Sequence, residues 1–260
     1  ASAGVTFPTF AAGADAARQV VQTKLWPGNC RLLDPVEASA AAGMDGSKAL
    51  LLLGFESAEI PQDEFIQHAV KIARDAGGTV SDDDIKVSDS SAGRPQGETG
   101  RQGAVGAWRD SFLNAPYMKN HQAGLGFVTE TMETAVTWDR WPELDRAVRA
   151  ALQDALNRVC GGGTVSCRFT HVYTDGPAPY FTFEGMGRLG AELEMYAEIK
   201  QAASDAIIAA GGTITHHHAV GRLHRPWYDR QRPDLFAQSL KAIKKTLDPN
   251  GVLNPGLLID

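Results

Sequence analysis

The chain has too few cysteines to be held together by disulfides or a zinc knuckle. Cys30, Cys160 and Cys167 are the only three in 260 residues, and no two of them have the CxxC spacing. Such an odd, sparse set favours free thiols in a reducing compartment. We therefore expect a cytoplasmic protein.

The sequence also has no long apolar run and no basic stripe, and we expect no secretory leader. No apolar run approaches the roughly 20 residues that span a bilayer. The first ten residues, ASAGVTFPTF, have neither the basic nor the apolar part of a signal peptide. The formal net charge of −6, without a basic stripe that carries interleaved aromatics, argues against a nucleic-acid partner. With 43% hydrophobic and 22% charged residues, the composition is that of an ordinary soluble globular protein.

What the chain does contain is one structural pattern repeated in residues 1–80 and 124–220. Apolar or alternating runs such as the unbroken Leu50 to Leu53 indicate strands, and apolar residues at helical spacing that end at glycines indicate helices. In the first half, the sequence predicts strands over 5–7, 31–34 and 48–56, and helices over 11–25, 36–42 and 61–76. In the second half, it predicts strands over 126–138, 165–173, 179–184 and 213–218, and helices over 142–160 and 192–210.

Strand, helix, hairpin, helix, strand is the order of a split βαβ unit of the ferredoxin-like kind. Two such units predict an α+β fold, in which an antiparallel sheet is covered by helices on one face. Residues 81–103 are rich in Asp, Ser and Gly, and we expect them to form an exposed flexible loop. The main domain is expected over 1–225, followed by a closing helix (234–247) and tail within 226–260.

A GxGxxG motif lies between a predicted strand and a predicted helix, at Gly185, Gly187 and Gly190. This motif can hold the pyrophosphate of a dinucleotide. The strand before it alternates instead of running apolar, as an antiparallel strand does, and the next strand ends in histidines instead of a ribose-binding carboxylate. A plain loop is the preferred interpretation.

Three consecutive histidines, His216, His217 and His218, end the last predicted strand. Imidazole exchanges protons near neutral pH, which suits it to acid–base chemistry. On a strand, His216 and His218 would share one face and His217 the other. The same-face pair with His224 could hold a metal, and a purely structural role in hydrogen bonding is a further alternative.

Two other side chains are candidates with ordinary alternatives. Tyr180 lies in a hairpin beside Phe181 and Phe183, where aromatic packing alone would explain it. Arg168, on the partner strand, could be a surface cation or point toward the same site as Tyr180.

Several segments together resemble the C-terminal, substrate-side half of FAD-linked oxidases of the vanillyl-alcohol-oxidase superfamily. The resemblance is strongest to the alkyldihydroxyacetonephosphate synthase branch. It runs in family order over essentially the whole chain, and the triple histidine is its most specific part. The matching segments are Val5 to Phe10, Arg31 to Asp34, Pro116 to Asn120, Glu133 to Asp139, Cys167 to Phe181, Gly211 to Gly221 and Leu253 to Gly256.

The resemblance implies a cap domain with a site built from named residues. FAD would be bound mostly by an N-terminal domain that precedes the first residue here, so this chain alone should have little activity. Tyr180 would exchange a proton with the substrate, and His216, His217 and His218 would relay that proton beside the flavin. His217, His218 and Asn254 would contact FAD, Lys119 and Arg168 would bind the substrate, and no metal is expected.

One departure from the family pattern concerns the substrate. The substrate-binding arginine of the family falls on Lys119, which keeps the charge but loses the bidentate fork that grips a phosphate. The substrate is therefore expected to be a small or lipid-like alcohol or hydroxy acid. The expected partners are the FAD domain and, through an exposed apolar sheet face, a second copy of the chain. The alternative is a stand-alone ferredoxin-like module that binds a metal or a partner.

Overall fold

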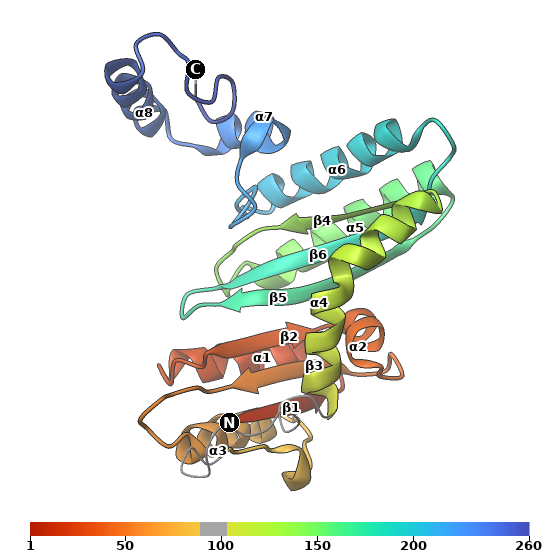
Figure 1. Ribbon diagram of the computed structural model, residues 1–260, viewed down its shortest axis with the longest axis vertical. Helices are drawn as coiled ribbons and strands as arrows, with labels where there is room; N and C mark the ends of the chain where they lie inside the picture. The colour runs from red at the N-terminus through yellow and green to blue at the C-terminus, as the bar shows by residue number, and fades with distance from the viewer. Residues whose placement is uncertain (89–102, 260) are drawn as a thin grey trace.

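In the described part of the chain, six antiparallel strands form a single sheet in the order β1-β3-β2-β5-β6-β4 (Figure 1). The structure, a computed structural model, describes residues 1–88 and 103–259. The strands are β1 (Ser2–Phe7), β2 (Asn29–Leu33), β3 (Ala49–Gly54), β4 (Phe127–Glu133), β5 (Thr164–Val172) and β6 (Pro177–Met186). The helices are α1 (Phe10–Gln22), α2 (Pro35–Ala42), α3 (Asp63–Asp75), α4 (Gly103–Gly124), α5 (Trp141–Cys160), α6 (Glu192–Ala209), α7 (Gly221–Gln231) and α8 (Asp234–Leu247).

The sheet consists of two equivalent halves joined at its centre. In each half the first strand pairs with the third and the third with the second, as β1-β3-β2 and β4-β6-β5. The halves meet where β2 pairs with β5, with Leu32 opposite Phe169 and Leu33 opposite Arg168. The predicted α+β class, with two split βαβ units in an antiparallel sheet, is confirmed.

The main core fills the space between one sheet face and the helices α1, α3, α5 and α6. Each strand places alternate side chains on this face, such as Val5 and Phe7 of β1 and Phe181 and Phe183 of β6, all fully buried. The helices present apolar residues at helical spacing, as Leu144, Val148 and Leu152 do in α5.

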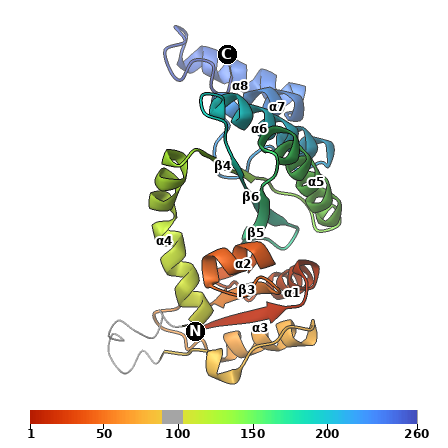
Figure 2. The same cartoon turned by 90° about the vertical axis from the view of Figure 1, so that its right-hand side faces the viewer.

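The prediction that helices cover only one face was wrong, because α2 and α4 lie on the other side of the sheet (Figure 2). Leu33, Leu50 and Leu52 point to this second face and pack with Ala38 of α2 and Trp108 of α4 in a small separate cluster. The unbroken leucine run in β3 is explained by this arrangement, since both of its faces are buried.

The last predicted strand, over 213–218, is not a strand. Thr213 donates its backbone N–H to the carbonyl of Ala135, just beyond β4, at 3.0 Å. Its hydroxyl then accepts from the Ala135 N–H at 2.9 Å, and its carbonyl accepts from the Thr134 hydroxyl at 2.7 Å. These side-chain bonds replace a strand ladder, and residues 213–220 continue as a loop into α7.

The segment predicted as a loop over 81–103 is partly structured where it is described. Residues Asp82–Asp84 form a 3₁₀ turn, and Lys86 forms an isolated bridge with Ser2 at the edge of the sheet. Residues 89–102 lie outside the described part, and α4 begins at Gly103. The boundary predicted at residue 225 falls inside α7.

The glycines of the GxGxxG motif are accounted for by close packing. A Cβ on Gly187 would lie 2.6 Å from the carbonyl oxygen of Gly126, and one on Gly185 would lie 2.9 Å from Sγ of Cys160. Gly190 has a positive φ of 83°, which glycine adopts without strain. The motif therefore serves the turn from β6 to α6.

Candidate active site

The site lies on the α4 side of the second half of the sheet, where three strands bring polar residues into one row. In the register of the sheet, Tyr180 of β6 is opposite Glu133 of β4 on one side and Arg168 of β5 on the other. All three side chains therefore lie on the same face. The sequence left the direction of Arg168 open, and the structure brings it to Tyr180, with its guanidinium carbon 4.0 Å from the ring centroid.

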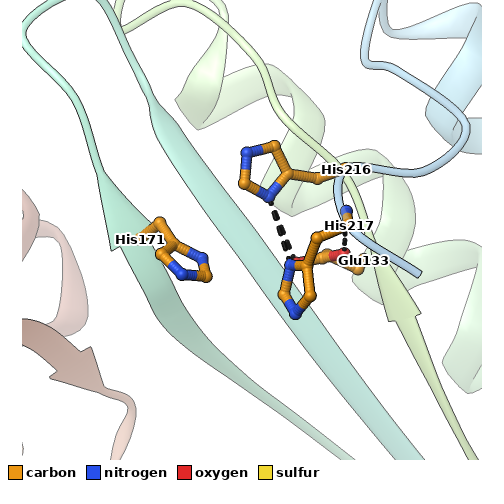
Figure 3. A group of neighbouring side chains, drawn as sticks. All are labelled: Glu133, His171, His216 and His217. Atoms are coloured by element: carbon orange, nitrogen blue, oxygen red, sulfur yellow. Dashed lines mark hydrogen bonds and ion pairs between the residues drawn. The ribbon is translucent and has the colours of Figure 1, made fainter. Parts of the chain in front are cut away.

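Glu133 lies against two histidines of one loop, His216 and His217 (Figure 3). Its side chain is 0% exposed, and its Oε2 accepts from the backbone N–H of His217 at 2.7 Å. Its Oε1 contacts Nδ1 of both His217 and His216, the latter at 3.3 Å. A buried carboxylate is stable only when its oxygens are paired, and two neighbouring residues of one loop supply these contacts.

The sequence analysis missed Glu133 as a site residue, although it opens one of the family-like segments. The signal in the sequence was a carboxylate inside the predicted strand 126–138, directly after the apolar Met132. Its partners are 83 and 84 residues away in the chain, so no local pattern connects them.

The directions predicted for the histidines were wrong, because the segment is a loop. His216 and His217 turn together toward Glu133. His218 points to Tyr180, with their ring centroids 5.3 Å apart and nearly perpendicular. The cluster also takes in Tyr173, whose hydroxyl lies 3.0 Å from Nε2 of His216.

Partial desolvation favours the neutral form of two histidines in this cluster. Desolvation lowers the pKa of His218, partly offset by the nearby charge of Glu133. Desolvation also lowers the pKa of His171 on β5, and the neighbouring His217 and His216 lower it further. At neutral pH both imidazoles are therefore proton acceptors beside Tyr180 and the other histidines.

Two predicted site residues lie apart from this cluster. Lys119, on α4, is half-exposed and forms an ion pair with Glu130 at 3.3 Å. Asn254 lies in the turn after α8 with a positive φ of 46°. In the part of the chain that is described, no hydrogen bond or ion pair links either residue to Tyr180 or to the three histidines.

The arrangement also offers a set of possible metal ligands. Glu133, His171, His216 and His217 each present a ligand atom, and these atoms lie within 4.8 Å of one another. This is a different set from the one considered on the sequence. His224 takes no part in it, and its Nδ1 lies 2.9 Å from the carbonyl of Ala219.

No helix among residues 1–88 and 103–259 combines the length and apolar character needed to cross a membrane. The three cysteines are all unpaired, and Cys167 is buried.

Comparisons with known proteins agree with the fold. Residues 1–258 match the sequence model of the family described as FAD linked oxidases, C-terminal domain. The alkyldihydroxyacetonephosphate synthase of Caenorhabditis elegans is 36% identical over 148 residues, which cover 55% of this chain and 25% of that protein. The synthase of Dictyostelium discoideum is 24% identical over 264 residues, or 98% of this chain and 43% of that protein.

A solved structure of an alkyldihydroxyacetonephosphate synthase superposes with a TM-score of 0.69 at 19% identity, covering 98% of this chain and 44% of that one. The matched regions thus cover only a quarter to less than half of the length of each of these relatives. The family model covers nearly all of the chain, and the cofactor of that family is FAD. The chain therefore belongs to the C-terminal domain family of FAD-linked oxidases, in the vanillyl-alcohol-oxidase superfamily.

Proposed function

We propose that this chain is the substrate-binding and catalytic cap domain of an FAD-dependent enzyme related to alkyldihydroxyacetonephosphate synthase. The observation that carries the proposal is the row Arg168, Tyr180 and Glu133, with His218 against the tyrosine ring. The row combines a phenol, a cation and a set of imidazoles held by a buried carboxylate. A site of this composition suits proton transfer to or from a bound alcohol.

Each residue has a distinct part in this proposal. Tyr180 gives a proton to the substrate or takes one from it. Arg168, above its ring, stabilises negative charge on the phenol oxygen, although its own ion pair with Glu37 of α2 reduces that effect. His218 accepts the proton, while Glu133 fixes the directions of His216 and His217.

The residues present fit a flavin on the open side of the histidines. The side chain of His217 is 46% exposed, and His218 is exposed as well, so both rings have surface free for a second group. We propose that these two residues contact FAD, which supplies the electron-transfer chemistry when bound. We also propose that Asn254 contacts FAD, which requires α8 and the tail that follows it to approach the histidines.

The domain that carries FAD is the proposed partner of α8. No residue of α8 is buried within this chain, and Leu235 and Leu247 are each more than three-quarters exposed. A helix with an uncovered apolar stripe packs against another surface. Other exposed apolar residues lie on α4, among them Leu113, Tyr117 and Met118, so α8 and α4 are two surfaces that suit the predicted dimer.

The test is turnover of the complete flavoenzyme with Tyr180→Phe. Removing a general acid–base group should lower kcat by about 10²-fold or more, with FAD still bound as judged by its absorbance. Tyr228→Phe, on α7, is the matched control and should keep full turnover. Wild-type kcat in Tyr180→Phe would contradict the proposal.

A second candidate function is metal binding by Glu133, His171, His216 and His217. Nδ1 of His216 lies 3.3 Å from both Nδ1 of His217 and Oε1 of Glu133. That spacing is close to the separation of two ligands that each lie about 2.0–2.1 Å from a tetrahedral zinc ion. Nδ1 of His217 and Oε1 of Glu133 are in direct contact, so they would have to separate to bind the same ion. Equilibrium dialysis against Zn²⁺ tests it: stoichiometric binding that His171→Gln abolishes and His224→Gln preserves would favour this function.

A further inference from the structure

An arginine without a carboxylate partner lies next to the proposed site. Arg31, on β2, makes no ion pair with any residue of the described ranges. Because Leu32 pairs with Phe169, Arg31 lies beside Thr170 across the central strand pair. Its guanidinium stacks on α4, with its carbon 4.6 Å from the ring centroid of Trp108. The aromatic ring holds one face of the guanidinium and leaves its N–H groups available.

Unsatisfied polar atoms gather around this arginine. In residues 1–88 and 103–259, six buried side-chain nitrogens or oxygens have no hydrogen-bond partner. Four of the six lie on the adjacent strands β2 and β5: Nη1 of Arg31, Nε of Arg168, Oγ1 of Thr170 and Nδ1 of His171. Buried polar groups are rarely left unpaired, and the two guanidinium nitrogens can only donate. The donors of both arginines therefore lack an acceptor.

The local charge points in the same direction. Arg31 and Arg168 each carry a positive charge, and Glu37, paired with Arg168, is the carboxylate that opposes them. Burial lowers the pKa of Arg31, and repulsion from the positive charge of Arg168 lowers it further. An added negative charge between them would relieve this repulsion.

Space for a ligand adjoins the cluster. A cavity of about 450 Å³ is lined by Arg31, Thr170, His171 and Tyr173, with Asp175 also in its wall and Arg168 outside its lining. Its volume falls in the range of small-molecule sites. Tyr173 also reaches His216, and Arg168 lies over Tyr180, so a molecule bound here extends naturally toward the proposed proton-transfer residues.

We propose that Arg31 and Arg168 bind an oxyanion of the substrate, a phosphate monoester or a carboxylate, with Thr170 as an additional donor. That the oxyanion belongs to the substrate rests on the proposed function, whereas the binding itself does not. The fork of Arg31 matches such groups in a bidentate way. Lys119, the position suggested by the sequence, is already paired with Glu130 and is not the anion site.

The experiment is calorimetric titration of this chain with two probes, glycerol 3-phosphate and D-lactate, at constant ionic strength so that screening does not change. We expect saturable millimolar binding of at least one probe, and the stronger of the two identifies the oxyanion. Arg31→Gln should weaken it by about 10- to 100-fold, the usual effect of losing charged hydrogen bonds. Lys119→Gln, the matched control, should change it less than about twofold.

A milder variant guards against misfolding of Arg31→Gln. Thr170→Val is nearly isosteric, removes one hydroxyl and should weaken binding by about 2- to 10-fold. Two results would overturn the proposal: neither probe binds at up to about 10 mM, or binding survives Arg31→Gln and is lost in Lys119→Gln. Because the titration involves neither flavin nor turnover, its failure would leave the proposed role of Tyr180 untouched, and the reverse also holds.

Discussion

Replacing Glu133 by glutamine should loosen the histidine loop without leaving a cavity. The carboxylate is fully buried and accepts from the His217 N–H at 2.7 Å. Glutamine keeps one acceptor oxygen but loses the charge, so charge-assisted contacts of about 1.5–3 kcal/mol are lost. At about 2–4 °C per kcal/mol for a chain of this size, the melting temperature should fall by about 3–12 °C.

The assay combines thermal unfolding with a pH titration of the histidines by NMR. Glu133 is one of the groups that raise the pKa of His218, so that pKa should fall further in Glu133→Gln. Glu130→Gln is the matched control on the same strand. Its side chain is 25% exposed and paired with a half-exposed lysine, so less than about 1 kcal/mol should be lost. Its charge also raises the pKa of His218, but less than that of Glu133 does, so the fall in this pKa should be smaller in Glu130→Gln. If both variants melt alike and His218 titrates as in wild type, Glu133 does not position the histidines.

Three further predictions concern the frame around the site. Asp34→Asn should lower the urea-derived unfolding free energy by about 3–5 kcal/mol, since Asp34 is buried and pairs with Arg149 at 2.8 Å; a loss below about 1 kcal/mol would contradict this. Gly176→Ala should cost about 1–3 kcal/mol, because its Cβ would lie 1.9 Å from the carbonyl oxygen of Val136; unchanged stability would show that the turn adapts. The unfolding free energy should also fall as the pH drops below about 6.5. Folding lowers three histidine pKa values, so the unfolded chain binds more protons than the folded chain in this range. Denaturation curves between about pH 7.5 and 5.5 check the sign, and an unfolding free energy that does not change with pH would contradict it. These histidines are His171, His218 and His224.

The sheet could be predicted from the sequence because burial on one or both faces leaves a local pattern. The Leu50 to Leu53 run indicated β3, and the apolar stripe of Leu144, Val148 and Leu152 indicated α5. Turn residues fixed the ends, as at Gly161, whose positive φ of 76° ends α5. The predicted halves and their order followed from these elements.

Helix α4 left no such pattern. Gly106 is its only buried residue, so no apolar stripe marks a face, and Pro116 lies within it, which argues against a helix in any local analysis. The helix is held by scattered contacts instead, such as the hydrogen bond from Gln122 to Glu184 of β6 at 2.6 Å. The site was predictable in part: the resemblance named Tyr180 and the histidines, but not Glu133, whose partners are distant in the sequence.

The two halves of the sheet explain why the site is where it is. β3 and β6 are equivalent strands, and on the α4 side β3 presents Leu50 and Leu52, whereas β6 presents Tyr180 and Thr182. The first half therefore closes this face with a small apolar cluster, which anchors α4 and adds stability. The second half leaves the same face polar and partly open. Arg31 lies at the border between the two halves, on the central strand pair and stacked on Trp108 of α4. In the proposed anion site, a substrate would place its oxyanion at this border, beside the apolar cluster, and its other end would reach the polar face of the second half.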